Sequence, residues 1–410
     1  MDVYEVLQQR GFLKQCTHPG EVREALSQGE VTFYVGFDPT AASLHVGSLL
    51  QIMAMAWLQR LGHRVLALVG GGTARVGDPS GRSELRQMLS DAQIDANSEG
   101  IRTQISHFLE LDGERGQLVD NADWLLKLQY IPFLRDIGRQ FSVNRMLAAE
   151  AYKQRLERGL SFIEFNYQIL QAYDFLELYR RHGCRLQLGG DDQWGNIVAG
   201  VDLVRRMESA EVWGLTTPLL TTATGAKMGK TAQGAIWLDG ERLAPFDYWQ
   251  YWYNCHDDDV GRFLRLYTFL DEEEIVRLEA LSGKEIRDAK RVLADETTRL
   301  LHGDAAAAAA SGAASAMVRS EAAADLPTHP LSAPERLLVI LVDAGLASSR
   351  SEARRLVAQG AVRIDGNRVD DPEQQIAPGA EGSVVRVGKK RVVRIIEGGR
   401  RPGGAGRGKP

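Results

Sequence analysis

The chain has few cysteines and no long apolar run, and each scarcity excludes a class of protein. Only three cysteines occur among 410 residues, Cys16, Cys184 and Cys255, and none forms a CxxC pair. Neither a disulfide framework nor a zinc knuckle can be built from them. No apolar run approaches the ~18 residues that span a bilayer, and the first residues, MDVYEVLQQR, lack the regions of a secretion signal. We therefore expect a reduced, cytoplasmic protein with no membrane partner and no structural metal.

The charge of the chain is unevenly distributed. Its composition, 44% hydrophobic and 25% charged, is typical of a globular protein, and its length suggests roughly two to three domains. The net charge is −5, but residues 335–410 carry 15 Lys+Arg against 9 Asp+Glu, a net of +6. The first 334 residues therefore carry 34 against 45, a net of −11. A basic module of this kind either binds nucleic-acid phosphates or is an ordinary solvated surface.

The N-terminal half has the pattern of an α/β fold. Residues 31–37 (VTFYVGF) and 64–69 (RVLALV) are strand-like apolar runs, and a helical pattern from Val46 to Leu61 lies between them. Such a βαβ unit pairs its strands in parallel. A further strand at 185–188 and a helix at 161–181 follow. We predict a Rossmann-like parallel-sheet catalytic domain at 1–220.

The rest of the chain reads as two smaller domains. Amphipathic patterns at 246–302, with no strand between them, predict an α-helical domain. Together with the lysine-bearing loop before it and an alanine-rich stretch after it, this domain is placed at 221–325. LPTHPLSAP at 326–334 is typical of a semi-rigid linker, and 398–410 of a disordered basic tail. Between them, 335–397 predicts a small α+β domain, with helices at 337–344 and 352–359, the second opened by Ser351, and strands at 362–364, 383–387 and 391–396.

The segment GFDPTAASLHVGS (36–48) lies between the first strand and its helix. The first turn of a helix carries unpaired N–H groups and the positive end of the helix dipole, so this place favours an anion. Gly47 leaves room for a flat ring, and His45 and Thr40 are potential donors to phosphate oxygens. The alternative is a plain turn, with Ser43 as helix N-cap and His45 on the surface.

Two further segments carry basic residues near glycines. In AKMGKT (226–231), Lys227 and Lys230 suit a polyphosphate, although a solvated loop has the same composition. VGGGTARVGDPSGR (69–82) is neither a P-loop, since Asp78 follows the second glycine, nor a dinucleotide fingerprint. Arg82 and Arg86 beyond it are either a clamp for a leaving phosphate or a polar face.

These residues resemble a known family. LHVGS (44–48) resembles the HIGH signature and KMGKT (227–231) the KMSKS signature of class I aminoacyl-tRNA synthetases. The longer segments YVGFDPTAASLHVG, VGDPSGR, NYQILQAYDF and QLGGDDQWGN are similar, nearly residue for residue, to bacterial tyrosyl-tRNA synthetases. The C-terminal part resembles the small RNA-binding module first described in a small-subunit ribosomal protein. The resemblance covers essentially the whole chain.

The resemblance implies an activity and its partners. It implies a tyrosine–tRNA ligase that activates L-tyrosine with ATP and Mg²⁺, releases diphosphate, and transfers tyrosine to the 3′-terminal ribose of tRNA(Tyr). Because the carboxylate of tyrosine is already ionised at pH 7, the reaction needs positioning and charge more than a strong base. The resemblance also implies that the helical domain binds the anticodon and that the protein is a homodimer; no DNA partner is expected.

The resemblance assigns residues to L-tyrosine. Tyr34 and Asp174 match the residues that hydrogen-bond the phenolic hydroxyl, and phenylalanine would leave both unpaired, which is costly. Taken alone, they read as a half-buried strand residue and a helix-surface acid. Tyr167, Gln171 and Asp174 share one helix face at i, i+4 and i+7. The full set implied for tyrosine is Tyr34, Asp78, Tyr167, Gln171, Asp174 and Gln187.

The resemblance also assigns residues to ATP and to its chemistry. Those implied to bind ATP are Gly36, Asp38, Thr40, His45, Gly47, Ser48, Gly190, Asp192, Gln193 and Lys230. Thr40, His45, Lys227, Lys230 and Thr231 would stabilise charge on the transferring and leaving phosphates, with Arg82 and Arg86 closing over them. Gly190, Asp192 and Gln193 follow the predicted strand at 185–188. This placement is the usual one for ligand-binding residues, because parallel sheets bind ligands beyond the carboxyl ends of their strands.

The chain departs from the family pattern at four positions. Ser48 replaces the second histidine of HIGH, Val35 and Gln51 replace small polar residues near the ribose, and Gly229 replaces the serine of KMSKS. We expect shifted adenosine affinity from the first three and a looser loop from Gly229.

The basic C-terminal residues that we expect to bind RNA lie on one helix and one hairpin. Phosphate and shape are what a module gripping folded RNA would read. The residues that we expect to bind RNA are Arg350, Arg354, Arg355, Lys389, Lys390 and Arg391. The alternative is that these residues form an ordinary surface paired with acidic side chains.

Two competing functions remain at this point. One is a sister enzyme that adenylates tryptophan, or another ATP-dependent nucleotidyltransferase, against which Tyr34 and Asp174 argue. The other is a non-catalytic RNA-binding paralogue, which would have a broken phosphate site, whereas His45, Lys227 and Lys230 are intact.

Overall fold

The computed structural model describes most of the chain, in two compact units. The described residues are 2–80, 89–148, 152, 156, 159–225, 228–231, 234–324, 327–365, 367–369, 371–377, 382–388 and 391–397, of which 230, 231 and 317–324 have only their backbone described. Contacts divide the chain into Met1–Ser311 and Gly312–Pro410. Outside the described residues lie the basic tail predicted at 398–410 and five predicted site residues, Arg82, Arg86, Lys227, Lys389 and Lys390.

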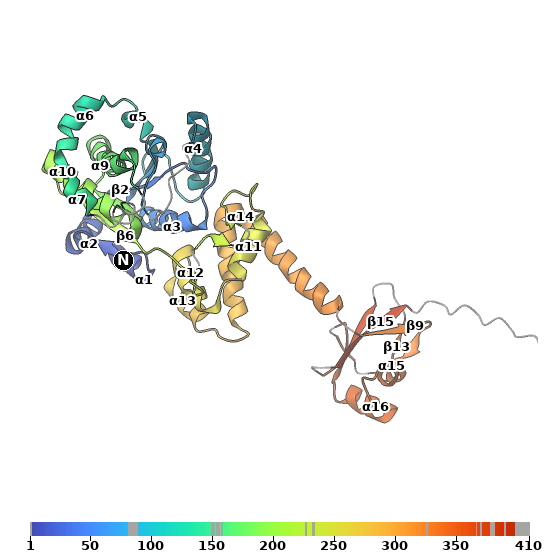
Figure 1. Cartoon of the computed structure of the whole chain (residues 1–410). Coiled ribbons are helices and arrows are strands. Elements are labelled where there is room, and N and C mark those ends of the chain that lie inside the picture. Colours follow the sequence, from blue (N-terminus) through green and yellow to red (C-terminus); the bar gives the residue numbers. More distant parts are fainter. Residues whose placement is uncertain are drawn as a thin grey trace, which may run out of the picture. The chain divides into compact units, whose positions relative to one another are not determined.

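A six-stranded sheet forms the centre of the first unit (Figure 1). Its strand order is β1-β6-β5-β2-β3-β4, with β1 antiparallel and the other five parallel. The order reverses between β2 and β5, so the connections leave a crevice at the carboxyl ends of these two strands. The strands are β1 (Gln15–Cys16), β2 (Thr32–Phe37), β3 (Arg64–Val69), β4 (Gly116–Asp120), β5 (Leu186–Gly190) and β6 (Trp213–Thr217).

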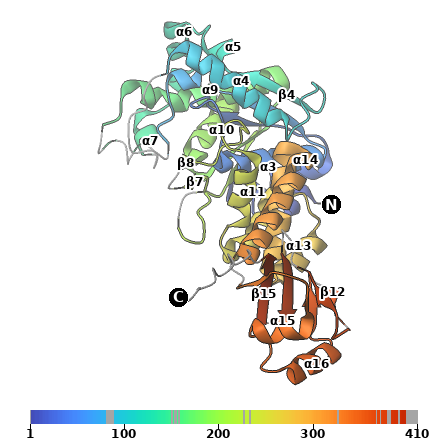
Figure 2. The same ribbon diagram turned by 90° about the vertical axis from the view of Figure 1, so that its right-hand side faces the viewer.

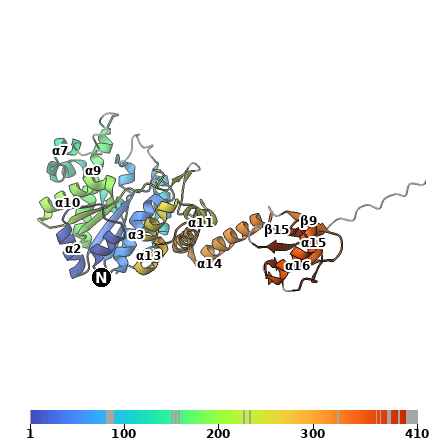
Figure 3. The ribbon, with the colours of Figure 1, turned by 90° about the horizontal axis from the view of Figure 1, so that it is seen from below.

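Helices cover both faces of this sheet, with α3 on one face and α9 and α10 on the other (Figure 3). The sheet interior is apolar because β2, β3 and β5 are built from residues such as Leu66 and Leu186, which are fully buried. Phe175 of α9 packs against Tyr34 of β2 with the ring centroids 5.4 Å apart. The helices of this region are α1 (Val3–Gln9), α2 (Pro19–Gln28), α3 (Val46–Arg60), α4 (Asp91–Ser106), α5 (Ala122–Leu125), α6 (Tyr130–Asp136), α7 (Val143–Leu147), α9 (Phe162–His182) and α10 (Trp194–Glu208), with 3₁₀ turns η1 (Thr73–Arg75), η2 (Gly138–Gln140) and η3 (Asp191–Gln193).

A helical segment follows the sheet after the short hairpin of β7 (Lys230–Thr231) and β8 (Gly234–Ala235). Its elements are α11 (Pro245–Tyr253), η4 (Asp257–Asp259), α12 (Val260–Tyr267), α13 (Glu272–Glu279) and α14 (Ile286–Ala324). Aromatic rings form its core, with Trp252 packed against Tyr248, Phe263 and Tyr267. Gly303 has a φ of +84°, which interrupts the helical backbone of α14.

The second unit contains a small α+β fold (Figure 2). Its main sheet has the order β12-β11-β14-β15-β9, and β10 pairs with β13. Side chains of α15 and α16 share one apolar core with the sheet, including Leu337, Val357 and Val385. The elements are β9 (Thr328–Leu331), β10 (Glu335–Arg336), α15 (Leu337–Asp343), α16 (Arg350–Ala358), β11 (Val362–Ile364), β12 (Asn367–Arg368), β13 (Gln375–Ile376), β14 (Ser383–Val387) and β15 (Arg391–Glu397).

The predicted fold class is confirmed, and β2, α3 and β3 form the expected parallel βαβ unit. Two local predictions were wrong. Within the predicted linker 326–334, residues 328–331 form β9, which pairs in parallel with β15 and buries Leu331. The helix expected to open at Ser351 is instead capped by Ser349, whose hydroxyl accepts the N–H of Glu352 at 3.2 Å.

Candidate active site

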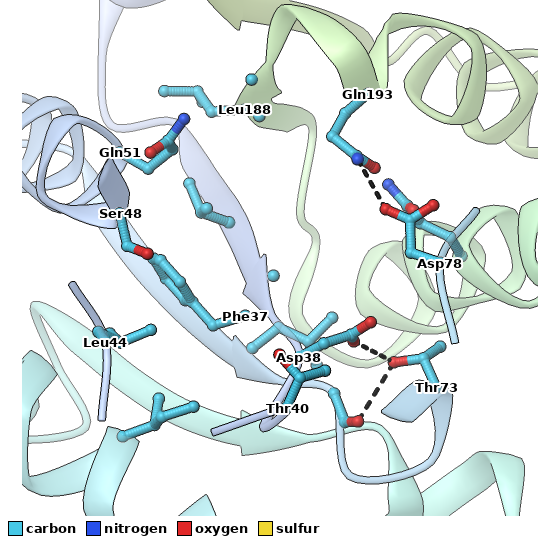
Figure 4. Close-up of a pocket in the computed structure, with 18 of the residues that line it drawn as sticks. Phe37, Asp38, Thr40, Leu44, Ser48, Gln51, Thr73, Asp78, Leu188 and Gln193 are labelled. Carbon is cyan, nitrogen blue, oxygen red and sulfur yellow. Dashed lines mark hydrogen bonds between the residues drawn. The ribbon is translucent and has the colours of Figure 1, made fainter. Parts of the chain in front are cut away.

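A cavity of about 320 Å³ opens at the carboxyl ends of β2 and β5 (Figure 4). It collects side chains from β2, the turn before α3, η1, α9 and η3. All of the residues predicted for tyrosine and ATP whose side chains are described line it: Tyr34, Gly36, Asp38, Thr40, His45, Gly47, Ser48, Asp78, Tyr167, Gln171, Asp174, Gln187, Gly190, Asp192 and Gln193. Gln187 lies within β5, as does Gly190, which we had expected after a strand that ends at Leu188.

One end of the cavity is deeply buried. Tyr34 is 1% exposed on β2 and pairs in register with Gln187 of β5. Among the described residues, neither the Tyr34 hydroxyl nor Gln187 Oε1 has a hydrogen-bond partner, although both atoms are buried. Unpaired buried polar atoms cost stability unless a bound group satisfies them. This end of the cavity therefore suits a ligand with a polar atom of its own.

Asp174 on α9 faces the same end. It is 2% exposed, and its carboxylate accepts Asn121 Nδ2 at 2.9 Å and Trp124 Nε1 at 2.7 Å. Burial raises the pKa of Asp174 to about 8, and the two N–H donors only partly oppose this rise. Burial, followed by the charge of Asp174, also raises the pKa of Tyr34 well above its ordinary value. Tyr34 is therefore a neutral hydroxyl beside an acid that takes up its own proton below about pH 8.

Asn121 and Trp124 are site residues that the sequence analysis missed. Asn121 follows β4 directly, accepts the N–H of Gly72 through Oδ1 at 2.7 Å, and donates to Thr73 Oγ1 at 2.9 Å as well as to Asp174. It thus joins the η1 turn to the acid of α9. The available signal was an asparagine and a tryptophan directly after a short strand (QLVDNADW), but that strand was itself not predicted.

A second acidic group lies along the middle of the cavity. Asp38 accepts Thr73 Oγ1 at 2.7 Å and the Tyr167 hydroxyl at 2.9 Å. Asp78 accepts Gln193 Nε2 at 2.8 Å and the backbone N–H of Ser80 at 2.9 Å (Figure 4). Burial raises the pKa of Asp78, and the neighbouring charge of Asp38 adds to the rise. Two neighbouring acidic side chains make this part of the cavity favourable for a cationic group.

Amide side chains connect α9 to α10 beside Asp78. Asn196 Nδ2 donates to Gln171 Oε1 and to Gln193 Oε1, each at 3.1 Å. Burial raises the pKa of Asp192, which is next to Gln193. These contacts fix the amide orientations, so Gln171 and Gln193 present defined groups to the cavity.

The opening turn of α3 forms the other end of the cavity. His45 is the N-cap residue, and its Nδ1 accepts the N–H of Gly47 at 2.9 Å. Ser43, the alternative N-cap, instead donates to the Leu44 carbonyl at 2.7 Å, so that alternative was wrong. A Cβ at Gly47 would lie 2.5 Å from His45 Cε1, so glycine is required for this compact turn.

The second signature lies against this turn. Gly229 has a φ of +79°, and a Cβ on it would lie only 2.7 Å from the Gly47 nitrogen. Backbone bonds join the two segments, from Ile236 N to the Gly229 carbonyl at 3.0 Å and from Val46 N to the Ile236 carbonyl at 2.9 Å. Gly229 therefore permits close contact between the two signatures, a role different from the loosening we expected. Lys230 and Thr231, which follow it, form β7.

The remaining departures from the family pattern also line the cavity. Val35 and Ser48 contribute to its wall, and Gln51 Nε2 donates to Thr217 Oγ1 at 3.2 Å. Gln51 thus makes a contact inside the protein with a neighbouring strand.

The described residues predicted to bind RNA lie on the second unit. Arg350, Arg354 and Arg355 are exposed on α16. Arg354 pairs with Glu373, and Arg391 pairs with Glu352 of α16 and donates to the Leu346 carbonyl. The sequence analysis missed a row of arginines on adjacent strands, in which Arg363 of β11 is in register with Arg368 of β12 and Arg386 of β14. A β-period alternation of Arg with buried Val in 362–364 and 383–387 was the available signal.

Neither a membrane-spanning helix nor a metal-binding cluster occurs among the described residues. No described helix is long and apolar enough to cross a membrane. In the part of the chain that the structure describes, no group of three or more His, Cys, Asp or Glu side chains is arranged to hold a metal ion.

The chain was compared with known protein families and proteins. Residues 26–319 match the family described as tRNA synthetases class I (W and Y), and residues 335–381 match the S4 domain. The tyrosine–tRNA ligase of Desulfosudis oleivorans is 50% identical to it, covering 97% of this chain and 99% of that protein. The tyrosine–tRNA ligase of Paracoccus denitrificans is 51% identical, with 95% and 97% covered.

Solved structures agree with these matches. A C-terminally truncated mitochondrial tyrosyl-tRNA synthetase of Aspergillus nidulans superposes with a TM-score of 0.70 at 32% identity, covering 77% of this chain and 94% of that chain. A tyrosyl-tRNA synthetase of Archaeoglobus fulgidus, solved with L-tyrosine, shares the fold at a TM-score of 0.58 and 17% identity, with 76% and 100% covered.

Proposed function

This chain belongs to the family of class I tyrosyl-tRNA synthetases, and we propose that the cavity at the ends of β2 and β5 is where it binds tyrosine and ATP. Its activity is that of a tyrosine–tRNA ligase: L-tyrosine is activated with ATP to tyrosyl-adenylate, and the tyrosyl group is then transferred to the 3′-terminal ribose of tRNA(Tyr).

The buried end of the cavity would hold the phenol ring of tyrosine. The observation that carries this assignment is that the Tyr34 hydroxyl, buried without a described partner, and the Asp174 carboxylate line the same cavity. A phenolic hydroxyl would donate to Asp174 and accept from Tyr34. Phenylalanine lacks this group and would leave both buried groups unpaired, so it would be rejected.

The middle of the cavity would hold the α-amino group and direct the carboxylate. Asp78, Tyr167 and Gln171 would bind the ammonium group, which is attracted to the acidic cluster. The tyrosine carboxylate would then attack the α-phosphate of ATP, and pyrophosphate would leave. This step forms one C–O–P linkage and breaks one P–O–P linkage, and no general base is needed because the carboxylate is already ionised.

The turn before α3 would hold the phosphates. The N–H groups of the first turn of α3, together with His45 and Thr40, would stabilise charge on the transferring phosphate. Lys227, Lys230 and Thr231, with Arg82 and Arg86, complete this proposal, and Gly36, Asp38, Gly47, Ser48, Gly190, Asp192 and Gln193 would contact the nucleotide. Charge stabilisation without covalent chemistry is the usual demand of phosphoryl and nucleotidyl transfer.

Mg²⁺ would accompany ATP. This ion prefers oxygen ligands and usually retains waters while it bridges carboxylates and phosphates. The side chains of Asp38 and Asp192 line the same cavity, but no three acidic side chains among the described residues are arranged to hold a metal ion by themselves, so the phosphate oxygens of ATP would supply most of its ligands. When bound, the ion would neutralise phosphate charge.

The RNA partner would contact the second unit and the helical segment. We propose that tRNA(Tyr) meets Arg350, Arg354, Arg355, Lys389, Lys390 and Arg391, and that residues 221–325 contact the anticodon. The net charge of +6 over residues 335–410 supports binding to phosphates. We retain 1–220 as the catalytic domain and 335–397 as the RNA-binding domain, and we propose a cytoplasmic location, where tRNA is charged.

A homodimer is the proposed assembly. Large apolar side chains are exposed between α6 and the start of α9, including Tyr130 (60%), Ile131 (69%) and Phe162 (70%). These side chains are clustered along the sequence at 126–163, and exposed large apolar side chains are typical of a surface that is covered in an oligomer.

The proposed function is tested by amino-acid-dependent exchange of pyrophosphate into ATP, measured for each of the twenty amino acids. We expect exchange with tyrosine and a rate at least about 10³-fold lower with phenylalanine, because two buried polar groups would lose their partner. Preferred exchange with tryptophan would support the sister activity, and exchange with no amino acid would support a non-catalytic RNA-binding protein.

A further inference from the structure

The second-signature segment, defined here as residues 220–238, is held by two helices that do not line the cavity. Arg262 of α12 donates through Nη2 to the Thr221 carbonyl at 2.7 Å. Asp259, directly before α12, accepts the N–H of Ala223 at 2.8 Å. The segment is thus anchored by side chains that lie more than 30 residues further along the chain.

The anchor at α12 is an ion pair in which the carboxylate is buried and the Arg262 side chain is 41% exposed. The Asp259 side chain is 3% exposed and lies 2.5 Å from Arg262 Nη2. One oxygen of Asp259 takes the arginine and the other takes the Ala223 amide. A buried carboxylate that is fully hydrogen-bonded holds its partners in a fixed geometry, because losing either bond leaves a charge unpaired.

A second anchor lies deeper in the segment, on α11. The Tyr251 hydroxyl donates to Met228 Sδ at 3.2 Å, and the Met228 side chain is buried at 6% exposure. Burial raises the pKa of Tyr251 to about 12, while a backbone hydrogen bond from Gly229 partly opposes the rise, so the hydroxyl keeps its proton. The Tyr251 ring packs edge-on against Trp252, with centroids 5.3 Å apart, within the aromatic core of the helical segment. The hydroxyl is therefore presented from a rigid helix.

The anchor at α11 leads directly to the phosphate end of the cavity, and the anchor at α12 is joined to it by the hydrogen bond from Met228 N to the Leu220 carbonyl at 3.1 Å, next to Thr221. Gly229, next to Met228, approaches the Gly47 nitrogen so closely that a Cβ would lie 2.7 Å from it. The Met228 carbonyl lies beside Gly47 as well, 3.3 Å from where a Cβ on Gly47 would be. A path of direct contacts therefore runs from α11 through Met228 and Gly229 to the His45–Gly47 turn.

We propose that Tyr251, Asp259 and Arg262 are positioning residues for adenylate formation, because they fix the second-signature segment against the phosphate-binding turn. The inference rests on the proposed function and adds to it three residues that touch neither substrate. Through these residues, the helical segment sets the geometry of the charge-stabilising groups, whose contribution depends on placement within a fraction of an ångström.

The test uses Tyr251→Phe and Arg262→Gln in the full-length chain. Tyr251→Phe removes only the hydroxyl and keeps the ring in the aromatic core. Arg262→Gln removes the bond to Thr221 and the ion pair. The matched control is Arg277→Gln. It breaks an i,i+3 pair with Glu274 on α13 at 2.6 Å, just as Arg262→Gln breaks an i,i+3 pair with Asp259, but both side chains of the control pair are accessible.

Tyrosine-dependent pyrophosphate exchange with varied tyrosine and ATP gives kcat and the two KM values, and equilibrium dialysis gives tyrosine affinity. We expect kcat to fall roughly 5- to 20-fold in each variant, with tyrosine affinity unchanged within about twofold, because one positioning bond is lost only at the phosphates. Arg277→Gln should match the wild type.

Three results would overturn the proposal. The first is unchanged kcat in both variants, and the second is an equal loss of tyrosine affinity and kcat, which a general structural defect would produce. The third result applies if Arg262→Gln does not fold, so that Tyr251→Phe must decide alone. In that case a wild-type kcat in Tyr251→Phe would overturn the proposal. Absence of tyrosine-dependent exchange in the wild type would instead contradict the proposed function, so the two failures are distinguishable.

Discussion

At the scale of single residues, Asp174 shows how specificity and stability conflict. A carboxylate buried at 2% exposure would be costly if ionised, yet two N–H donors, from Asn121 and Trp124, are arranged for the ionised form. The pKa of Asp174 is about 8, because burial raises it and the two N–H donors lower it by less. The protein keeps the acid because the phenolic hydroxyl of the proposed substrate needs an acceptor there.

This conflict predicts a pH-dependent gain in stability for Asp174→Asn. The folded-state pKa of about 8 lies above the ordinary value of 3.8, so the folded protein binds the proton more tightly than the unfolded chain. Stabilisation by protonation is complete below about pH 4 and is lost as the pH rises towards 8. Asparagine never ionises. We therefore expect the Tm of the variant to rise relative to the wild type by several degrees between pH 5 and pH 8.5, while tyrosine-dependent exchange falls.

The control for this experiment is Asp123→Asn, an exposed acid near Trp124 in the sequence. Its Tm difference from the wild type should not change with pH. A difference for Asp174→Asn that is equally flat would show that Asp174 does not titrate in this range.

The residues around Asp174 also show what sequence can reveal about a site. Tyr167, Gln171 and Asp174 follow helical spacing, so their shared face was predictable, and the structure lines them along one cavity. Asn121 was not predictable, because its role depends on the pairing of β4 with β3 and on the approach of α9, two contacts between distant parts of the chain. Burial decides the chemistry of such residues, and a single sequence does not show burial of a polar side chain.

At the scale of elements, the close contact of the second signature with the α3 turn depends on glycine. Gly229 combines a left-handed φ of +79° with a close approach to the Gly47 backbone. Gly225 has nearly the same φ, +82°, but nothing lies within 4 Å of where its Cβ would be. Alanine substitutions at the two positions therefore distinguish the effect of backbone strain from the effect of a steric clash.

We expect Gly229→Ala to lower the kcat of tyrosine-dependent exchange by at least about tenfold, because the Cβ would push the second signature away from the phosphate-binding turn. Gly225→Ala introduces the same strain without the clash and should stay within about threefold of the wild type. Steady-state exchange kinetics of both variants decide the matter. Equal losses in the two variants would assign the effect to strain.

Elements differ in how well sequence predicts them. The strands β2 and β3 are continuous apolar runs next to a helix with clear periodicity, so the βαβ unit followed from the pattern alone. By contrast, β9 contains Pro330 in a proline-rich stretch, and its partner β15 lies more than 60 residues further along. An edge strand tolerates proline, and pairing with a distant strand leaves no local signal. The short β4 also lacks a local signal, because its residues GQLVD include only two large apolar side chains.

At the scale of the whole molecule, the two units predict separable activities. The cavity lies entirely in Met1–Ser311, and the basic module in Gly312–Pro410. A chain ending at Ala324 should therefore retain tyrosine-dependent exchange but lose at least about tenfold in tRNA charging, because phosphate contacts supply much of RNA affinity. Equal loss of both activities would contradict a separate RNA-binding arm.

The position of the cut is itself informative. A chain ending at Pro334 would keep β9 without its partner β15 and would expose Leu331, which is 8% exposed in the intact sheet. An unpaired apolar strand favours edge-to-edge association. We expect this longer chain to aggregate more readily than the one ending at Ala324, as measured by light scattering at equal concentration.

The exposed apolar side chains near α6 and α9 predict how the molecule associates. Phe162 is 70% exposed and Ile131 69%, and burying rings and aliphatic chains of this size is the main source of affinity in a stable interface. Phe162→Asp would place a charge in that interface, so we expect the sedimenting species to change from a dimer to a monomer of 45.3 kDa. The matched control is Val276→Asp on α13, an exposed apolar residue (52%) outside this cluster, which should remain dimeric. If the wild type sediments as a monomer, the cluster has another partner; if Phe162→Asp remains dimeric, the subunits meet elsewhere.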